Sequence, residues 1–145
     1  MLQPMDEPKL NNFAVIGNPV AHSLSPYIHQ SFASQFGIQL SYEKMLTEKE
    51  NFQQTVDEFF ATGGQGLNIT TPFKSMAADY VHFCSVVAKA SNSVNTIYKN
   101  EKGELYGEST DGIGWLADIN RLGIDLVEKK VLVIGAGGAA RIIIN

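Results

Sequence analysis

The sequence predicts an α/β fold built on an open, mostly parallel mixed sheet flanked by helices, and three observations carry this prediction. Short apolar runs that end at glycine or proline alternate with stretches whose apolar residues recur every three or four positions. Two further runs are separated by only a short turn at 100–103, so one antiparallel hairpin interrupts the alternation. Residues 130–134 form another apolar run that enters a glycine turn, so a second α/β unit begins there.

The first half of the chain predicts strands and helices in strict alternation. The strands are expected at 13–17, 40–46 and 66–70, because each of these apolar runs stops at a loop residue. Ser25 before Pro26 is the expected N-cap of the first helix, and a glycine follows the end of that helix. The apolar stripe of this helix consists of Ile28, Phe32 and Phe36.

The second helix is expected to start at a capping box, because Thr47 and Glu50 have the required spacing. Its apolar face consists of Phe52, Val56, Phe59 and Phe60. Residues 76–90 predict one or two further helices, and 94–98 with 104–106 predict the hairpin. The last amphipathic helix begins at Gly112 and ends at Gly123, with Trp115, Leu116, Ile119 and Leu122 on its apolar face.

Composition excludes several classes of partner. With 145 residues, 44% of them hydrophobic, the chain can bury one ordinary core. The net charge of −4 includes no basic block, so nucleic acid is not the expected ligand. No run approaches the roughly 18 apolar residues of a membrane span. A single cysteine, Cys84, suits a reducing cytoplasm, and residues 1–8 read as a disordered lead-in without a targeting signal. A small molecule is therefore the expected partner.

The last residues contain a glycine pattern that is typical of phosphate binding. Gly135, Gly137 and Ala140 fit G-x-G-x-x-G/A, which follows a strand in Rossmann-type nucleotide-binding domains. The residue that reads the ribose lies roughly 20 positions further on in such domains. We therefore expect three parts: a small-molecule-binding domain at 1–110, a connector helix at 111–123, and the truncated start of a Rossmann-type domain at 129–145. This last part is expected to be frayed or paired with another copy, because it has no sheet of its own.

Four polar clusters fall at the expected strand ends, which form the ligand-binding rim of open α/β sheets. They are the stretches at 23–26, 68–74, 93–96 and 109–112. Together with the glycine turn, this ordered series resembles shikimate dehydrogenase from residue 13 to the last residue. The resemblance implies a two-domain enzyme that reduces 3-dehydroshikimate to shikimate with NADP, in aromatic amino-acid biosynthesis. The sequence departs from the family pattern at 92–93, where Gly-Ala is usual, and at Ser109, where Asn is usual.

The resemblance also implies roles for individual residues. The substrate-binding positions of the family fall on Ser23, Ser25, Thr70, Lys74, Asn95 and Asp111. The catalytic positions fall on Lys74 and Asp111. The cofactor-binding positions fall on Gly135, Ala136, Gly137, Gly138 and Ala139. No spacing of histidines with acidic residues or cysteine predicts a metal site.

Physical chemistry supports these roles but leaves purely structural roles open for the same residues. A substrate with a carboxylate and hydroxyls needs short polar side chains and a helix N-terminus. Ser25 equally fits an ordinary N-cap, whereas Ser23 lies outside the helix with no expected capping role. An ammonium such as that of Lys74 can donate a proton to a carbonyl oxygen during reduction. A carboxylate such as that of Asp111 would hold the ammonium charged and in place. Without the resemblance, Lys74 fits a surface lysine and Asp111 an N-cap.

Three other functions are compatible with the same pattern. A quinate/shikimate dehydrogenase is the near alternative, and a non-catalytic module that binds small carboxylates is the distant one. A dehydrogenase acting on a folate or an amino acid fits the glycine turn but not the polar series. The sequence leaves open NADP against NAD, and a monomer against a homodimer.

Overall fold

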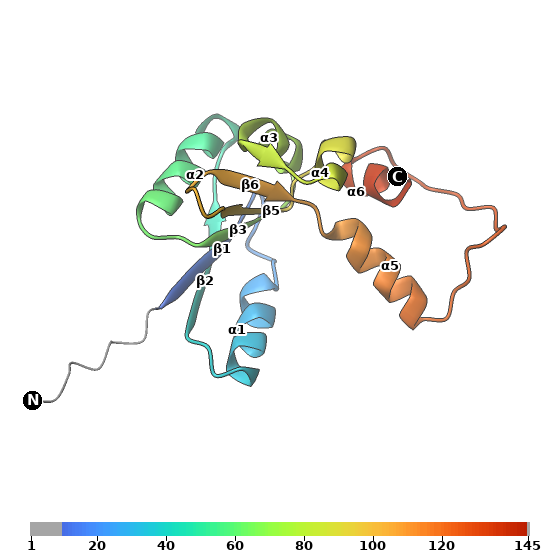
Figure 1. Cartoon of the computed structure of the whole chain (residues 1–145), viewed down its shortest axis with the longest axis horizontal. Helices are drawn as coiled ribbons and strands as arrows, with labels where there is room; N and C mark the ends of the chain where they lie inside the picture. Colours follow the sequence, from blue (N-terminus) through green and yellow to red (C-terminus); the bar gives the residue numbers. More distant parts are fainter. Residues whose placement is uncertain (1–9, 145) are drawn as a thin grey trace, which may run out of the picture. The chain divides into compact units, whose positions relative to one another are not determined.

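The computed structural model describes residues 10–144 and divides the chain into two compact units, Met1–Thr71 and Pro72–Asn145 (Figure 1). The predicted lead-in at 1–8 lies outside the described residues. Each unit combines strands and helices, as the α/β prediction requires. No helix within residues 10–144 is long and apolar enough to cross a membrane.

The first unit is a parallel β-α-β-α-β series. Its strands are β1 (Asn11–Gly17), β2 (Leu40–Leu46) and β3 (Gly66–Ile69), and its helices are α1 (Ser25–Gln35), the 3-10 turn η1 (Lys49–Asn51) and α2 (Phe52–Ala61). Strand β1 pairs in parallel with β2 on one side and with β3 on the other. The three predicted strands are thereby confirmed to within two residues at each end.

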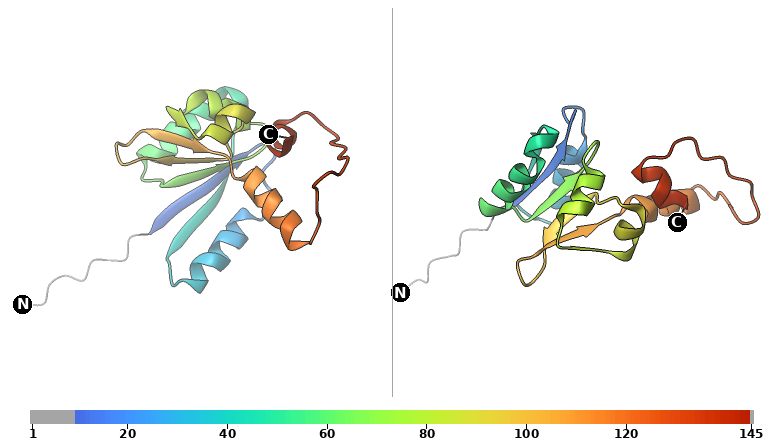
Figure 2. Two further views of the ribbon diagram at one scale, coloured as in Figure 1. Left: turned by 45° about the vertical axis from the view of Figure 1, so that its right-hand side comes forward. Right: turned by 90° about the horizontal axis from the view of Figure 1, so that it is seen from above.

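The position of β1 between its partners explains where the helices lie. The chain moves in one direction from β1 to β2 and in the opposite direction from β2 to β3. Because each parallel crossover is right-handed, α1 and α2 lie on opposite faces of the strands, as Figure 2 shows. The carboxyl ends of β1 and β3 therefore flank a topological switch point, where open α/β sheets bind ligands. Residues 18–24 and 70–71 follow these two strand ends.

Apolar side chains from strands and helix form the core of the first unit. Ile16, Leu67 and Ile69 are at most 2% exposed, and Phe52 and Val56 of α2 are fully buried. The predicted apolar face of α2 is therefore confirmed. The predicted apolar face of α1 is wrong, because Ile28, Phe32 and Phe36 are exposed and Ala33 is the buried residue of this helix.

The second unit contains the predicted hairpin. Its elements are α3 (Lys74–Tyr80), β4 (Phe83–Cys84), α4 (Val86–Ser91), β5 (Thr96–Lys99), β6 (Leu105–Glu108), α5 (Asp111–Arg121) and α6 (Gly138–Ile144). Strand β6 pairs antiparallel with β5 and parallel with β4. These pairs, with the parallel ones of the first unit, confirm a mostly parallel mixed sheet.

Close packing around Gly107 fixes the hairpin against the helices of its unit. A side-chain carbon at Gly107 would lie 2.7 Å from Val94 Cγ2 and 2.9 Å from Val81 Cγ2. Phe73, Val94 and Ile97 are fully buried. Only glycine leaves room for these side chains to meet across β6, so the position serves packing.

Two local predictions are wrong. Ser25 is the first residue of α1 rather than its N-cap, which is Leu24. Thr47 does not cap α2, because its hydroxyl hydrogen-bonds the hydroxyl of Thr55 at 2.8 Å. The prediction of one or two helices at 76–90 is confirmed by α3 and α4, but the short strand β4 between them was not predicted. A two-residue strand carries too little pattern to be read from sequence.

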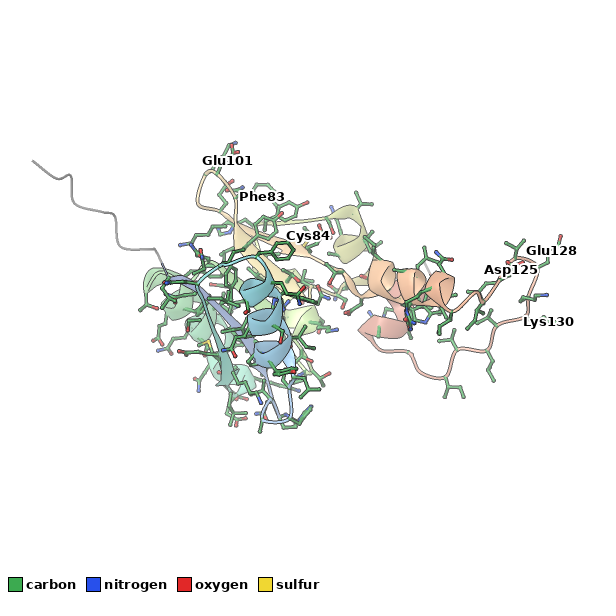
Figure 3. The ribbon with its side chains drawn as sticks, turned by 90° about the horizontal axis from the view of Figure 1, so that it is seen from below. Phe83, Cys84, Glu101, Asp125, Glu128 and Lys130 are labelled. Carbon is green, nitrogen blue, oxygen red and sulfur yellow. The ribbon has the colours of Figure 1, made fainter. Side chains whose placement is uncertain are left out.

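The predicted strand at 130–134 is also absent from the structure. Residues 124–137 have no regular secondary structure, and Leu132 and Ile134 are 84% and 92% exposed. Figure 3 shows the side chains of Asp125, Glu128 and Lys130 pointing outward along this segment. A strand needs a hydrogen-bonded neighbour, and no described strand pairs with these residues. This matches the expectation of a frayed segment, although the helix after the glycine turn does form.

Candidate functional site

Hydrogen bonds connect the serines at the start of α1. The Ser23 hydroxyl donates to Ser25 Oγ at 3.1 Å and accepts the Ser25 backbone N–H at 3.3 Å. Ser23 thus stabilises the first turn of α1, which corrects the expectation that it has no capping role. Both side chains are half-buried. Two hydroxyls therefore stand at the positive end of an 11-residue helix, where an anion is favoured.

Strand β2 contributes Tyr42 to the same cluster. Its hydroxyl donates to Asn68 Oδ1 at 2.5 Å, and its ring stacks on His29 with the centroids 4.5 Å apart. Burial raises the pKa of the Tyr42 phenol to about 12, although a hydrogen bond with Ser25 acts in the opposite direction. The phenol therefore remains a donor at neutral pH. Tyr42 links the helix start to the end of β3.

Backbone hydrogen bonds fix the loops that carry these side chains. Asn18 N–H donates to Thr71 O at 3.0 Å, and Thr70 N–H donates to Ile16 O at 2.9 Å. The methyl group of Thr70 lies against Gly17, where any added side chain would overlap it. Asn18 Nδ2 also donates to Thr47 O at 3.1 Å. The ends of β1 and β3 are therefore held together, as the switch-point topology requires.

The second unit carries a separate cluster centred on an ion pair. Lys74 begins α3 and Asp111 begins α5, and Lys74 Nζ lies 2.5 Å from Asp111 Oδ2. Their side chains are 25% and 29% exposed, so both charges remain accessible to a ligand. Lys74 O also accepts the Val94 N–H at 2.9 Å, which ties the start of α3 to the strand that follows α4. An oriented ammonium group can act as a proton donor.

Asn95 orients the carboxylate of this pair. Its amide Nδ2 donates to Asp111 Oδ1 at 2.8 Å and to Thr110 Oγ1 at 2.9 Å. Its Oδ1 accepts the Thr110 N–H at 3.1 Å and the Thr96 hydroxyl at 3.0 Å. The Asn95 side chain is thus held on both of its polar atoms, and a ligand hydroxyl reaches it by replacing one of these partners. One Asp111 oxygen faces Asn95 and the other faces Lys74.

Two buried hydroxyls near this cluster have no hydrogen-bond partner among the described residues. They belong to Ser93 and Ser109, which are 0% and 1% exposed. Both lie where the sequence departs from the pattern noted above. A buried hydroxyl without a partner loses its hydration without compensation, which costs about 1–3 kcal/mol.

Replacement of Ser109 by alanine is therefore expected to raise the free energy of unfolding by about 1 kcal/mol. Urea unfolding followed by circular dichroism measures the change. Ser41→Ala, at a half-buried serine of β2, is the control and should stay within about 0.5 kcal/mol of the unchanged chain. A loss of stability in Ser109→Ala would show that its hydroxyl has a partner.

The glycine turn at 135–139 leaves its backbone open at two glycines. Gly135 has φ +127°, a conformation that side chains disfavour. A side-chain carbon at Gly135 or Gly137 would meet no described atom within 4 Å, so the backbone there is open to a ligand. Gly138 is the first residue of α6. The residues present therefore fit the phosphate-binding part of a dinucleotide site.

The structure brings the predicted site residues together within each unit. Ser23 and Ser25 share one hydrogen-bonded cluster, and Thr70 lies at the adjoining strand end. Lys74, Asn95 and Asp111 share another. Sequence reasoning missed Tyr42, whose hydroxyl meets Asn68 across β1. It placed Asn68, Thr96 and Thr110 in the polar clusters but gave them no role of their own, whereas in the structure Thr96 and Thr110 support Asn95. Within residues 10–144, no group of three or more His, Cys, Asp or Glu side chains could hold a metal ion.

Comparison with known proteins gives a consistent result. A family model described as the shikimate dehydrogenase substrate binding domain matches residues 15–97. The shikimate dehydrogenase (NADP(+)) of Cellvibrio japonicus (strain Ueda107) is 46% identical over 129 residues, covering 89% of this chain and 47% of the relative. That of Legionella pneumophila (strain Corby) is 46% identical over 135 residues, covering 93% and 50%.

A solved structure has the same fold. The shikimate 5-dehydrogenase of Thermus thermophilus, crystallised with NADP(H) and shikimate, superposes with a TM-score of 0.84 at 37% identity, covering 92% of this chain and 50% of that one. The chain spans about half the length of the curated relatives it matches. Since the family model covers more than half of the residues, including both strand ends of the first cluster and Lys74 and Asn95 of the second, the chain belongs to the shikimate dehydrogenase family.

Proposed function

We propose that the protein containing this chain is an NADP-dependent shikimate dehydrogenase that reduces 3-dehydroshikimate to shikimate in aromatic amino-acid biosynthesis. In this proposal residues 1–110 bind the substrate, 111–123 connect the domains, and 129–145 begin the cofactor domain. The observation that carries the proposal is the Lys74–Asp111 pair held by Asn95, because it supplies an oriented proton donor in a chain of this family. The reducing cytoplasm is the proposed location, consistent with the free thiol of Cys84.

Substrate recognition in this proposal uses both clusters. Ser25 donates a hydrogen bond to the carboxylate, Ser23 does so by exchanging its bond to Ser25 Oγ for one to the ligand, and the N-terminus of α1 adds its partial positive charge. Thr70 and Asn95 contact the ring hydroxyls. Tyr42 positions Asn68 through their 2.5 Å hydrogen bond, which holds an amide group beside Thr70. Short polar side chains on fixed strand ends suit a small, rigid and highly hydroxylated ligand.

In this proposal Lys74 donates the proton and Asp111 holds Lys74 in place. NADPH, when bound, supplies the hydride that reaches the carbonyl carbon. As negative charge develops on the carbonyl oxygen, the Lys74 ammonium donates a proton to it. Asp111 fixes Lys74 Nζ in place by the 2.5 Å contact. In the reverse direction the neutral amine accepts the proton from the substrate hydroxyl.

The glycine turn would hold the pyrophosphate of the cofactor. Gly135, Ala136, Gly137, Gly138 and Ala139 form this turn. The open backbone at Gly135 and Gly137 supports the assignment. The preference for NADP over NAD rests on the names of the relatives, because the residue that reads the ribose lies beyond residue 145 in the usual spacing.

The decisive experiment measures oxidation and reduction by the full-length protein. Loss of NADPH absorbance with 3-dehydroshikimate is expected, and shikimate with NADP+ should give the reverse reaction. Equal turnover of quinate would favour the quinate/shikimate alternative, and faster turnover with NADH would change the cofactor. Shikimate binding by calorimetry without turnover of any of these substrates would identify a non-catalytic carboxylate-binding module.

Replacement of Tyr42 by phenylalanine is expected to raise the KM for shikimate about fivefold, because Asn68 loses a hydrogen bond with a net worth of about 1 kcal/mol. The value of kcat should change less, since the phenol touches no reacting atom. Tyr98→Phe, at a tyrosine that is 40% exposed on β5, is the control. An unchanged KM would remove Tyr42 from the substrate cluster.

A further inference from the structure

Helix α6, which follows the glycine turn, packs against other elements of the second unit at two positions. At each position a glycine meets a large or polar side chain. At Gly138 an added side-chain carbon would lie 2.7 Å from Ser93 Oγ and 3.2 Å from Ser93 Cβ. At Gly112 it would lie 2.5 Å from Ile142 Cγ2. Each contact joins α6 to another element, and in each a larger residue than glycine would displace the side chain that it meets.

Both contacts lie next to residues of the Lys74 cluster. Ser93 is two residues before Asn95, and Gly112 directly follows Asp111. Ile142 is 5% exposed, so α6 buries its apolar face there, and Figure 1 shows α6 beside α4 and α5. Helix α6 therefore packs on the segments that position Asn95 and Asp111.

Ser93 provides a second, independent observation. Its hydroxyl is fully buried, has no partner among the described residues and faces Gly138. A hydroxyl of this kind destabilises the fold by itself. Because Ser93 lies against the glycine turn, its side chain has a steric role: it limits how closely Gly138 approaches the segment that leads into β5.

We propose that Ser93 and Ile142 are positioning residues for the cofactor: Ser93 holds Gly138 of α6, Ile142 of α6 packs on Gly112, and together these contacts set the glycine turn in register with the Lys74–Asp111 pair. The inference rests on the proposed function for its cofactor. Seating requires no new contact with the nucleotide. It raises the fraction of molecules whose turn is in the binding-competent position, and apparent affinity scales with that fraction.

The test strains each contact in the full-length protein. Gly112→Ala and Gly138→Ala should each raise the KM and the calorimetric dissociation constant for NADP+ about tenfold, the effect of moderate overpacking. The KM for shikimate should change less than twofold. At saturating NADP+ kcat should recover, because bound nucleotide favours the seated form. Alanine favours a helix more than glycine does, so a loss in Gly112→Ala cannot come from helix propensity.

Second-site changes separate seating from direct effects on the nucleotide. Ser93→Gly should restore NADP+ affinity in Gly138→Ala, and Ile142→Leu, which removes Cγ2 at equal volume, should restore it in Gly112→Ala. Gly114→Ala, on the same helix as Gly112, is the matched control, because an added carbon at Gly114 meets no described atom within 4 Å. Absence of rescue, or a fall in kcat at saturation equal to the change in KM, would overturn the proposal.

A measurement without nucleotide keeps this test distinct from that of the proposed function. The Arg141 N–H donates to Gly137 O at 3.1 Å in the first turn of α6. Gly112→Ala and Gly138→Ala should each speed hydrogen exchange at this amide about tenfold, and each second-site change should reverse the effect. Unchanged exchange would overturn the seating even if the enzyme is active. Loss of activity in the unmodified protein would refute the proposed function and leave the exchange result standing.

Discussion

Lys74→Ala is expected to lower kcat of the full-length enzyme by about 10²–10⁴-fold, the usual contribution of a positioned proton donor. The KM for shikimate should change far less, because the ammonium acts mainly on the charge that develops in the transition state. Steady-state kinetics with shikimate and NADP+ measures both values. The expectation follows from geometry: Lys74 Nζ is fixed at 2.5 Å from Asp111 and remains 25% exposed, so it is both oriented and reachable.

The control for this substitution is Lys49→Ala, at an exposed lysine of η1, which should leave kcat unchanged. Lys74→Arg tests whether charge alone suffices, because a guanidinium keeps the charge but does not release its proton near neutral pH. A kcat within twofold of the unmodified enzyme in Lys74→Ala would make Lys74 an ordinary surface residue.

Asp111→Asn is expected to lower kcat on the order of 10²-fold, the cost of misplacing a reacting group by about 1 Å. The substitution removes the charge that holds Lys74 and replaces one acceptor oxygen by an NH2 donor, which must then face either the Asn95 Nδ2 donor or the Lys74 ammonium. Asp118→Asn is the matched control, because Asp118 lies on the same helix and pairs with Arg121 at the surface. Steady-state kinetics at saturating substrates measures kcat for both variants.

The double variant Lys74→Ala/Asp111→Asn sharpens this reading. If Asp111 acts by orienting Lys74, its substitution should cost little once Lys74 is gone, so the two effects should not add. Additive effects would mean that Asp111 contacts the substrate independently of Lys74. They would contradict the orienting role while leaving the proton donor in place.

Much of this fold can be predicted from the sequence because strand signals are local. The runs that form β1 and β3 have an apolar centre, are short and are followed by loop residues, so their pattern survives whatever packs around them. The hairpin is equally local, since its turn contains Gly103 at φ +79°. These features needed no knowledge of distant contacts.

Helix starts were predicted less well because capping depends on which acceptor lies nearest in space. Ser25 and Thr47 had the correct spacing for caps, yet their hydroxyls bind other side chains: Ser25 Oγ accepts from Ser23 in the loop before α1, and Thr47 Oγ1 pairs with Thr55. The apolar stripe of α1 failed for a related reason. Periodicity identifies a face but does not say whether a neighbour covers it.

The α/β class, the positions of β1 to β3 and of the hairpin, and the order of the polar clusters depend on residue type and spacing along the chain, so they can be predicted from the sequence. Which distant side chains meet depends on the tertiary structure. It placed Tyr42 against Asn68 and Asn95 against Thr110, pairs separated by 26 and 15 positions in the chain. It also left 130–134 without a strand, since backbone hydrogen bonds of a sheet form only with a neighbour that lies alongside.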